Sequence, residues 1–437
     1  MKLIFEEFLH IEKGNILFII GIFLLLSAPS ISAIFLLISL VISISKHKSY
    51  CLTNKSNYPF LIFGAIILIN VLIRTYFLKI NIDGFQPYLN IVGIANWLPF
   101  IGCYIFFQPY LNNLNKRKNV IYAYLSGSIP LFISGFGQKF FDWFGPIGIF
   151  RNLIIWFQRP ITDSEPMEGL FNNPNYTGSW FLLLVPLCLA CLKVKNNKIQ
   201  KKIFLLIFLG LLIFSIILTE SRNALLGSLL TFTFLTNKIS SLFLLVGILL
   251  LIVAFASFFI LIAPKIFYST LNLIFPEVIL NTLNLNQLNS NSFLLENSAR
   301  LSIWQESIKL IYEKPFLGWG SGNFSILFGV EKLNKWIYHP HNLIMEVAIS
   351  YGIITSLIFL FMVLKILALS FYKVYLKNKN IKNSIFDKAW WTAFFTLFIS
   401  QMFDIQYFDF RIGITFWIFL SGLTCMIKKK EGAVISS

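Results

Sequence analysis

The stretch NILFIIGIFLLLSAPSISAIFLLISLVISIS, residues 15–45, decides the fold class of this chain. Its apolar run is longer than the roughly 20 residues that cross a bilayer as one helix, and Pro29 interrupts it. Proline removes a backbone donor and disfavours helix in the residue before it, so the run predicts a hairpin of two membrane helices, 15–29 and 31–45. This hairpin decides which side of the membrane every later segment faces.

Composition extends the same interpretation to the whole chain. The 437 residues are 57% hydrophobic and only 13% charged, whereas a soluble domain carries about a quarter charged residues. Backbone amides in hydrocarbon need hydrogen-bond partners within their own segment, which favours helices. The apolar runs also lack the alternation of polar and apolar residues that is typical of a transmembrane β-barrel. We therefore predict an all-α, polytopic integral membrane protein with about 12 transmembrane helices. After the hairpin, the spans are expected at 58–79, 88–107, 119–137, 174–192, 203–219, 222–236, 240–263, 341–365, 389–404 and 411–427.

Basic residues indicate how these spans are oriented. With the N-terminus in the cytoplasm, the tight basic clusters at 116–118, 193–202 and 428–430 all face inward, and the outward basic residues are scattered. Both termini are therefore expected in the cytoplasm. The net charge of +17 mostly reflects anchoring on anionic membrane lipids, and the absence of a folded basic domain argues against a nucleic-acid partner.

We treat residues 1–437 as a single membrane domain with one large insertion. Residues 264–340 form an outward loop between spans nine and ten, and a structureless loop of that length would be unusual. Its apolar stripe predicts a helix over 299–313, with Asn297 or Ser298 capping the free amides at its start. The loop should therefore contain short helices of its own.

The arginines are distributed differently from the lysines, because most of the seven face outward. A guanidinium fork binds phosphate in bidentate fashion, so the group predicts an anionic ligand outside the membrane. Individually, each arginine could instead end a span and pair with Glu220, Asp404 or Asp409. The outward set is Arg151, Arg159, Arg222, Arg300 and Arg411, with Arg74 near the outer end of its span.

Four segments between residues 172 and 352 carry short motifs whose order and spacing are more specific than any one of them. The motifs are N-P-N at 173–175, S-R-x-A at 221–224, R-L-x-x-W at 300–304 followed by P-F-L-G-W-G at 315–320, and H-P-H-N at 339–342. Together they resemble the O-antigen ligase and O-antigen polymerase superfamily of integral membrane glycosyltransferases. Ser350 departs from the pattern, because many relatives carry a carboxylate before the position of Tyr351 and Gly352.

The resemblance implies a substrate and a location. The donor is a glycan on undecaprenyl pyrophosphate, and the acceptor is a hydroxyl of lipid A core or another glycan, at the periplasmic face of the bacterial inner membrane. The pyrophosphate gains negative charge as it leaves, and we assign Arg222 and Arg300 to stabilising it. The attacking hydroxyl needs a base near neutral pH, and His341 matches the motif position, with His339 as second choice. Direct displacement would invert the anomeric centre.

Further side chains near these motifs are expected to bind the substrate. Trp304 and Trp319 flank Arg300 and the glycine-rich turn and could stack on sugar rings, although interfacial belts explain outward tryptophans as well. Gly318, Gly320 and Gly322 could offer amides to a phosphate, but a plain turn is the commoner use. The full expected set is His339, Asn342, Trp304, Trp319, Arg74, Arg151, Arg159 and Arg411.

Other functions remain open at this stage. No metal or cofactor is expected, because no set of His and Cys ligands is evident and a solvated acidic loop explains Asp163, Glu165 and Glu168. Within the same superfamily, a polymerase would extend the lipid-linked glycan. A transporter or flippase, including one for bicarbonate, would share the twelve-span topology, but the long loop has no counterpart in the first half of the chain.

Overall fold

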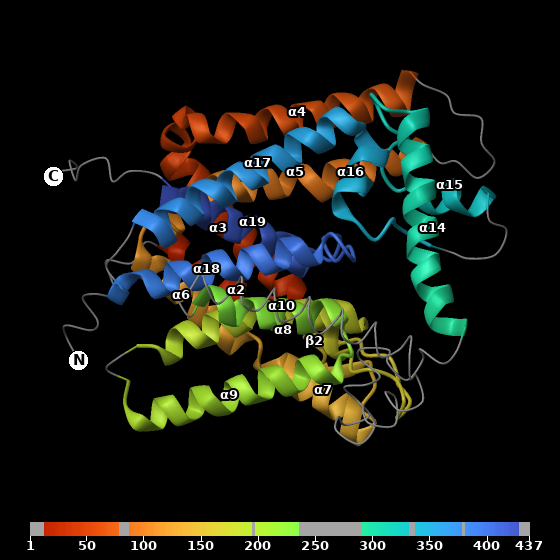
Figure 1. The fold of residues 1–437 in the computed structure, drawn as a ribbon. Coiled ribbons are helices and arrows are strands. Elements are labelled where there is room, and N and C mark those ends of the chain that lie inside the picture. Colours follow the sequence, from red (N-terminus) through yellow and green to blue (C-terminus); the bar gives the residue numbers. More distant parts are fainter. Residues whose placement is uncertain are drawn as a thin grey trace. The chain divides into compact units, whose positions relative to one another are not determined.

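The structure is a computed structural model that describes residues 13–77, 87–194, 197–235, 291–331, 337–377 and 381–427. Helices dominate these residues (Figure 1). The strands among them form one antiparallel hairpin, β1 Ile147–Ile149 with β2 Ile154–Trp156. The all-α prediction is confirmed. The span expected at 240–263 lies outside the described residues.

The chain divides into two compact units. The first comprises Met1–Gly127, Leu301–Lys379 and Gln401–Ser437, and the second comprises Ser128–Arg300 and Asn380–Ser400. The first unit contains α2 Lys13–Leu24, α3 Pro29–Thr53, α4 Tyr58–Leu72, α5 Asn90–Phe106, α6 Leu114–Gly127, most of α14 Asn291–Glu313, α15 Phe324–Glu331, α16 Leu343–Tyr351, α17 Ile353–Phe371 and α19 Phe410–Ile427.

Buried aromatic side chains form the core of the first unit. Trp97 on α5 stacks on Tyr407, with ring centroids 4.6 Å apart, and meets Phe359 on α17 and Trp417 on α19 edge-on. Trp417 also donates its indole N–H to the Tyr407 hydroxyl at 2.8 Å, so the polar ends of these rings are paired inside the core. This cluster joins α5, α17 and α19.

The predicted division of the N-terminal apolar run into two packed helices is confirmed, and of the two only α3 contains, among the described residues, a segment long enough to cross a bilayer. α2 ends at Leu24 and α3 begins at Pro29, which occupies the first turn, where its missing N–H costs nothing. The two helices pack closely because Gly21 faces Leu36, and the Ser32 hydroxyl donates to the Gly21 carbonyl at 2.6 Å.

The second unit is built around one buried helix, α8. This helix packs against α9, α10 and α18, and most of its side chains are buried. Its Ser179 hydroxyl meets that of Ser400, at the end of α18, at 3.0 Å. The helices of this unit are α7 Ile129–Phe141, α8 Pro174–Leu192, α9 Ile199–Leu218, α10 Arg222–Leu235 and α18 Ile381–Ser400.

The described helices confirm a polytopic membrane protein. Seven segments are long and apolar enough to cross a bilayer, and α2 and α5 are shorter apolar helices. The count of twelve spans is not established by these residues and stays a prediction. The seven segments are Pro29–Ser49, Lys55–Phe77, Leu114–Phe141, Pro174–Leu192, Ile199–Leu218, Ile353–Lys377 and Phe410–Ile427.

Several predicted helices have different bounds in the structure; the span expected at 119–137, for example, is divided into α6 and α7. Two of the differences have a clear local cause. The span expected at 341–365 is two helices, because Gly352 has a φ of +91° between α16 and α17. The helix expected at 299–313 begins instead at Asn291, so Asn297 and Ser298 lie inside it and do not cap it. Both differences arise from local signals that are ambiguous. A glycine inside an apolar run can continue a helix or end it, and an Asn-Ser pair before an apolar stripe can cap a helix or lie inside it.

We predict that Gly352→Ala destabilises the protein strongly. A Cβ at this position would lie 2.0 Å from the Phe316 carbonyl oxygen, and a positive φ costs a non-glycine residue about 1–2 kcal/mol before any clash is counted. Gly102→Ala is the matched control, because nothing lies within 4 Å of a Cβ there. Thermal unfolding of both purified variants in detergent measures the difference, and equal melting temperatures would contradict the prediction.

Candidate functional site

The segment His339-Pro340-His341-Asn342, which we call the histidine turn, ends where α16 begins. Asn342 has an extended backbone, and its side-chain oxygen accepts hydrogen bonds from the amides of Ile344 and Met345 at 3.0 and 3.1 Å. Asparagine is a preferred helix cap because this oxygen satisfies amides that have no partner in the first turn. His341 therefore lies directly before a residue whose conformation is fixed by the start of α16.

His341 is held in an unusual conformation beside a carboxylate. Its φ is +53°, in the left-handed region that non-glycine residues seldom occupy. Its Nδ1 lies 2.8 Å from Oδ1 of Asp404. The Asp404 side chain is only 5% exposed, whereas that of His341 is 28% exposed. A ring whose Nδ1 is engaged by a buried carboxylate presents Nε2 to a substrate, which is the arrangement of a general base.

The loop that supplies Asp404 is fixed to the histidine turn by the backbone. The Leu343 amide donates to the Gln401 carbonyl at 3.0 Å, and the Asn342 side-chain amide donates to the Met402 carbonyl at 3.1 Å. The Gln401 side-chain oxygen in turn accepts from the amides of Gln406 and Tyr407. Asp404 is thus positioned by the same residues that begin α16.

His339 supports His341 from the other side. Its Nδ1 accepts the His341 backbone N–H at 3.2 Å, and the two ring centroids are 4.5 Å apart in an edge-to-face arrangement. Burial, and secondarily the neighbouring His341, lower the pKa of His339 to about 4. His339 is therefore neutral at pH 7, as an acceptor must be, and of the two histidines only His341 makes a hydrogen bond to the carboxylate.

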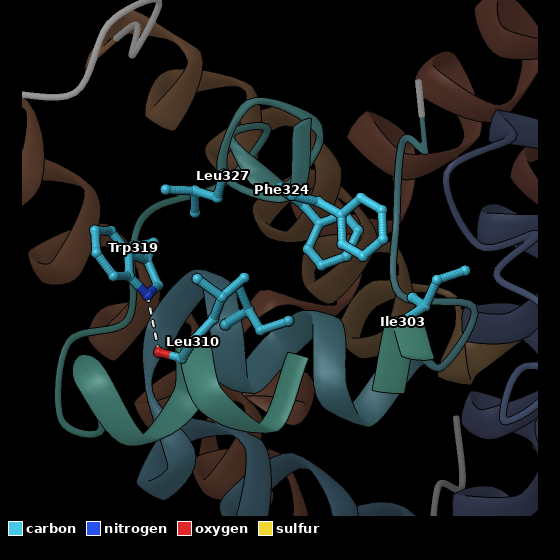
Figure 2. Packing of buried hydrophobic residues seen from close by; sticks show 7 residues of the cluster. Ile303, Leu310, Trp319, Phe324 and Leu327 are labelled. Atoms are coloured by element: carbon cyan, nitrogen blue, oxygen red, sulfur yellow. Dashed lines mark hydrogen bonds between the residues drawn. The ribbon is translucent and has the colours of Figure 1, made fainter. Parts of the chain in front are cut away.

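The two tryptophans of the neighbouring motif differ in their surroundings. Trp304 on α14 donates its indole N–H to the Pro340 carbonyl at 3.0 Å, so α14 contacts the histidine turn directly. Trp319 donates to the Leu310 carbonyl at 2.8 Å and is 7% exposed (Figure 2). The apolar cluster around it contains Ile303, Leu310, Phe324, Leu327, Phe328 and Ile349. Packing in the core accounts for Trp319 without any sugar ring.

The glycine-rich turn after α14 closes the far end of α16. Gly318 and Gly320 have positive φ values, and the amides of Trp319 and Gly320 donate to the carbonyls of Ile349 and Ser350 at 2.6 and 3.0 Å. These two amides are engaged within the protein, which favours the plain turn over a phosphate cradle. The turn satisfies carbonyls that the last turn of a helix leaves unpaired.

In the second unit the N-P-N and S-R-x-A motifs meet. Asn173 caps α8 through the amides of Asn175 and Tyr176, and the Ser221 hydroxyl donates to the Asn175 side-chain oxygen at 3.1 Å. Arg222 is the first residue of α10, directly after Ser221. Two motifs 46 residues apart thus form one polar cluster at the ends of two helices.

Comparisons with known proteins agree with these motifs. Residues 207–360 match the family model described as O-antigen ligase, a range that contains Arg222, Arg300 and His341. This segment is similar to O-antigen ligases. The similarity of the chain to the ComP-specific O-oligosaccharyltransferase of Acinetobacter baylyi is 26% identity over 239 residues, 53% of this chain and 40% of the relative.

The chain is also similar to a Rickettsia typhi protein named "Putative polysaccharide ligase". It is 33% identical over 141 residues, 30% of this chain and 31% of the relative. A Rickettsia prowazekii protein of the same kind is 32% identical over 141 residues, again 31% of its length. The matches therefore span about a third of these relatives.

Three of the other arginines expected to bind substrate have partners within the protein. Arg159 pairs with Glu165 and Glu168, and Arg411 pairs with Asp409 through two hydrogen bonds of 2.9 and 2.6 Å. Arg74 is 4% exposed, and its Nε lies 3.4 Å from the Leu317 carbonyl. Structural roles account for these three side chains. Arg151 lies in the turn between β1 and β2, and for Arg300 the structure describes only the helical backbone of α14.

The histidine turn also supplies the kind of ligand set that was not evident in the sequence. Ligand atoms of His339, His341 and Asp404 all lie within 4.8 Å of one another, as metal ligands do. Asp404 was missed because it is 63 residues from His341 and was considered only as a partner for an arginine. One sequence signal could have found Asp404. It is the last residue of the span expected at 389–404, and that end of the span was expected on the same side of the membrane as His341.

Proposed function

We propose that this protein transfers a glycan from undecaprenyl pyrophosphate to an acceptor hydroxyl of lipid A core or a similar glycan. The reaction takes place at the periplasmic face of the bacterial inner membrane, with both termini in the cytoplasm. It inverts the anomeric centre and needs no metal. The observation that supports this most directly is the 2.8 Å contact between the partly exposed His341 and the buried Asp404.

The proposed chemistry uses His341 as the base. Asp404 accepts a hydrogen bond from the Nδ1–H of His341, so the Nε2 lone pair is free to take the proton of the acceptor hydroxyl. As that oxygen bonds to the anomeric carbon, the bond from this carbon to the pyrophosphate oxygen breaks, and its electron pair leaves with the pyrophosphate. Asp404 then stabilises the imidazolium that has formed.

The leaving group requires positive charge, and we assign Arg222 and Arg300 to it. Preorganised cations at a site of developing negative charge often contribute the largest catalytic effect. Arg222 begins α10 within the motif cluster of the second unit, and Arg300 precedes Trp304 by one helical turn on α14. His339, Asn342 and Trp304 position the base and the acceptor around it.

We predict that His341→Ala lowers the rate of glycan transfer by about 10²–10⁴-fold, the usual contribution of a general base. Asp404→Asn should lower it less, because the base remains but its tautomer is no longer enforced. His47→Ala, on α3, is the control and should retain the wild-type rate. The measurement is transfer of a labelled lipid-linked glycan to acceptor by purified protein, and full activity of His341→Ala would refute the assignment.

The same variants in the host separate a ligase from a polymerase. Loss of capped lipopolysaccharide on a gel, with lipid-linked polymer accumulating, indicates a ligase. Surface products of a single repeat unit indicate a polymerase. Uptake of a solute by the purified protein without any glycan transfer would support the carrier instead.

We predict that Arg222→Ala and Arg300→Ala each raise the barrier to transfer by about 2–4 kcal/mol, because each removes one charge-assisted contact to the leaving group. The corresponding Arg→Lys variants should retain an intermediate rate, since lysine keeps the charge but not the bidentate fork. Single-turnover rates measure this effect. Alanine variants that match the wild type would show that neither arginine contacts the pyrophosphate.

We predict that transfer survives treatment with EDTA. A complete loss of activity that a divalent cation restores would instead indicate a metal-dependent reaction. The metal ligands would then lie either in the acidic loop that contains Asp163 or at the histidine turn with Asp404, and variants distinguish the two sites. Asp163→Asn in the loop before α8 should remove activity if the metal is held there, whereas retention of activity would point to the histidine turn.

A further inference from the structure

An apolar groove runs along α17 in the first unit, between this helix, the start of α4 and the end of α19. Its volume is about 630 Å³. Figure 1 shows α4 and α17 side by side, and the two helices are in contact. Most of the lining side chains are apolar, two are lysines, Lys55 and Lys365, and none of the residues that line it is acidic.

The two helices run antiparallel, which gives the groove a direction. The Asn70 side-chain amide, near the end of α4, donates to the Leu317 carbonyl at 2.9 Å and lies 3.4 Å from the Tyr351 carbonyl, just before α17 begins. Lys55, at the opposite end of α4, therefore lies toward the end of α17. From Ile354 to Leu369 the groove follows α17 for about 22 Å at 1.5 Å per residue, which is room for a full acyl chain.

Lys365 is the residue that requires a ligand. It is exposed on the surface of an apolar segment, Ile353–Lys377, where an ammonium group is costly without a counter-ion. Its Nζ lies 5.9 Å from the centroid of the Phe361 ring, one turn earlier on α17. Since no lining residue is acidic, the anion must come from a bound molecule.

We propose that this groove binds one anionic phospholipid. Lys55 and Lys365 contact its phosphate, the Ser56 hydroxyl lies at the same end of the groove, and an acyl chain lies along α17 past Phe361 to Ile354. The length of the groove fits an acyl chain, and the two lysines select an anionic over a neutral lipid. The proposal is independent of the transfer reaction, because none of these residues belongs to the site assigned to it.

The test titrates the purified full-length protein with phosphatidylglycerol or phosphatidylcholine and counts bound lipid by native mass spectrometry. The wild type should bind phosphatidylglycerol more tightly. The double variant Lys55→Gln, Lys365→Gln should bind it about 30-fold more weakly. Lys48→Gln, an exposed lysine on α3 outside the groove, removes the same charge and should change nothing. Equal binding of the two lipids by the wild type, or an unaffected double variant, would overturn the proposal.

A second pair of variants tests the acyl chain and leaves both lysines in place. Leu357→Trp fills the groove, whereas Leu364→Trp adds the same ring to an exposed position of α17 that does not line it. Only Leu357→Trp should weaken phosphatidylglycerol binding, and equal behaviour of the two would contradict the assigned path of the chain. Displacement of bound phosphatidylglycerol by an equimolar polyprenyl phosphate would show that a different lipid occupies the groove and would likewise overturn the proposal.

Discussion

The hydrogen bond between His341 and Asp404 depends on the backbone around it, and the rest of the site depends on that bond. A histidine at a φ of +53° is strained by an amount on the order of 1–3 kcal/mol, so its neighbours must hold it there. Asn342 does so through two cap bonds and one bond to Met402, and Trp304 does so through the Pro340 carbonyl. With these contacts in place, the Asp404 carboxylate meets Nδ1 of His341.

The short helix α16 is the support for this arrangement. Asn342 satisfies amides at its first turn, and the amides of Trp319 and Gly320 satisfy carbonyls at its last. The Ser350 hydroxyl also donates to the buried Glu346 carboxylate at 2.9 Å, so α16 carries a carboxylate one turn before the position at which many relatives have one. A nine-residue helix held at both ends therefore supports the histidine turn.

Particular residues explain how much of this was predictable. Apolar runs predict helices because nothing else satisfies backbone amides in hydrocarbon, and Pro29 and Pro315 marked true boundaries. His341, Trp304 and Asn342 could be selected from motifs that are local in sequence. Asp404 and the break at Gly352 could not, since each depends on a contact with a distant segment, with His341 and with Phe316 respectively. Trp319 was assigned to a cavity because the sequence does not distinguish an outward aromatic residue from a buried one.

Lysine and arginine are used differently in this protein, and this follows from their chemistry. Arg159 and Arg411 each bind carboxylates through the planar fork and make fixed, local ion pairs. Lys55 and Lys365 instead line an apolar groove without an acidic neighbour, and a flexible ammonium suits a lipid phosphate that exchanges with the bilayer. The basic side chains of this protein therefore have different roles. Paired arginines make local ion pairs with neighbouring carboxylates, and we assign the two lysines of the groove to a lipid.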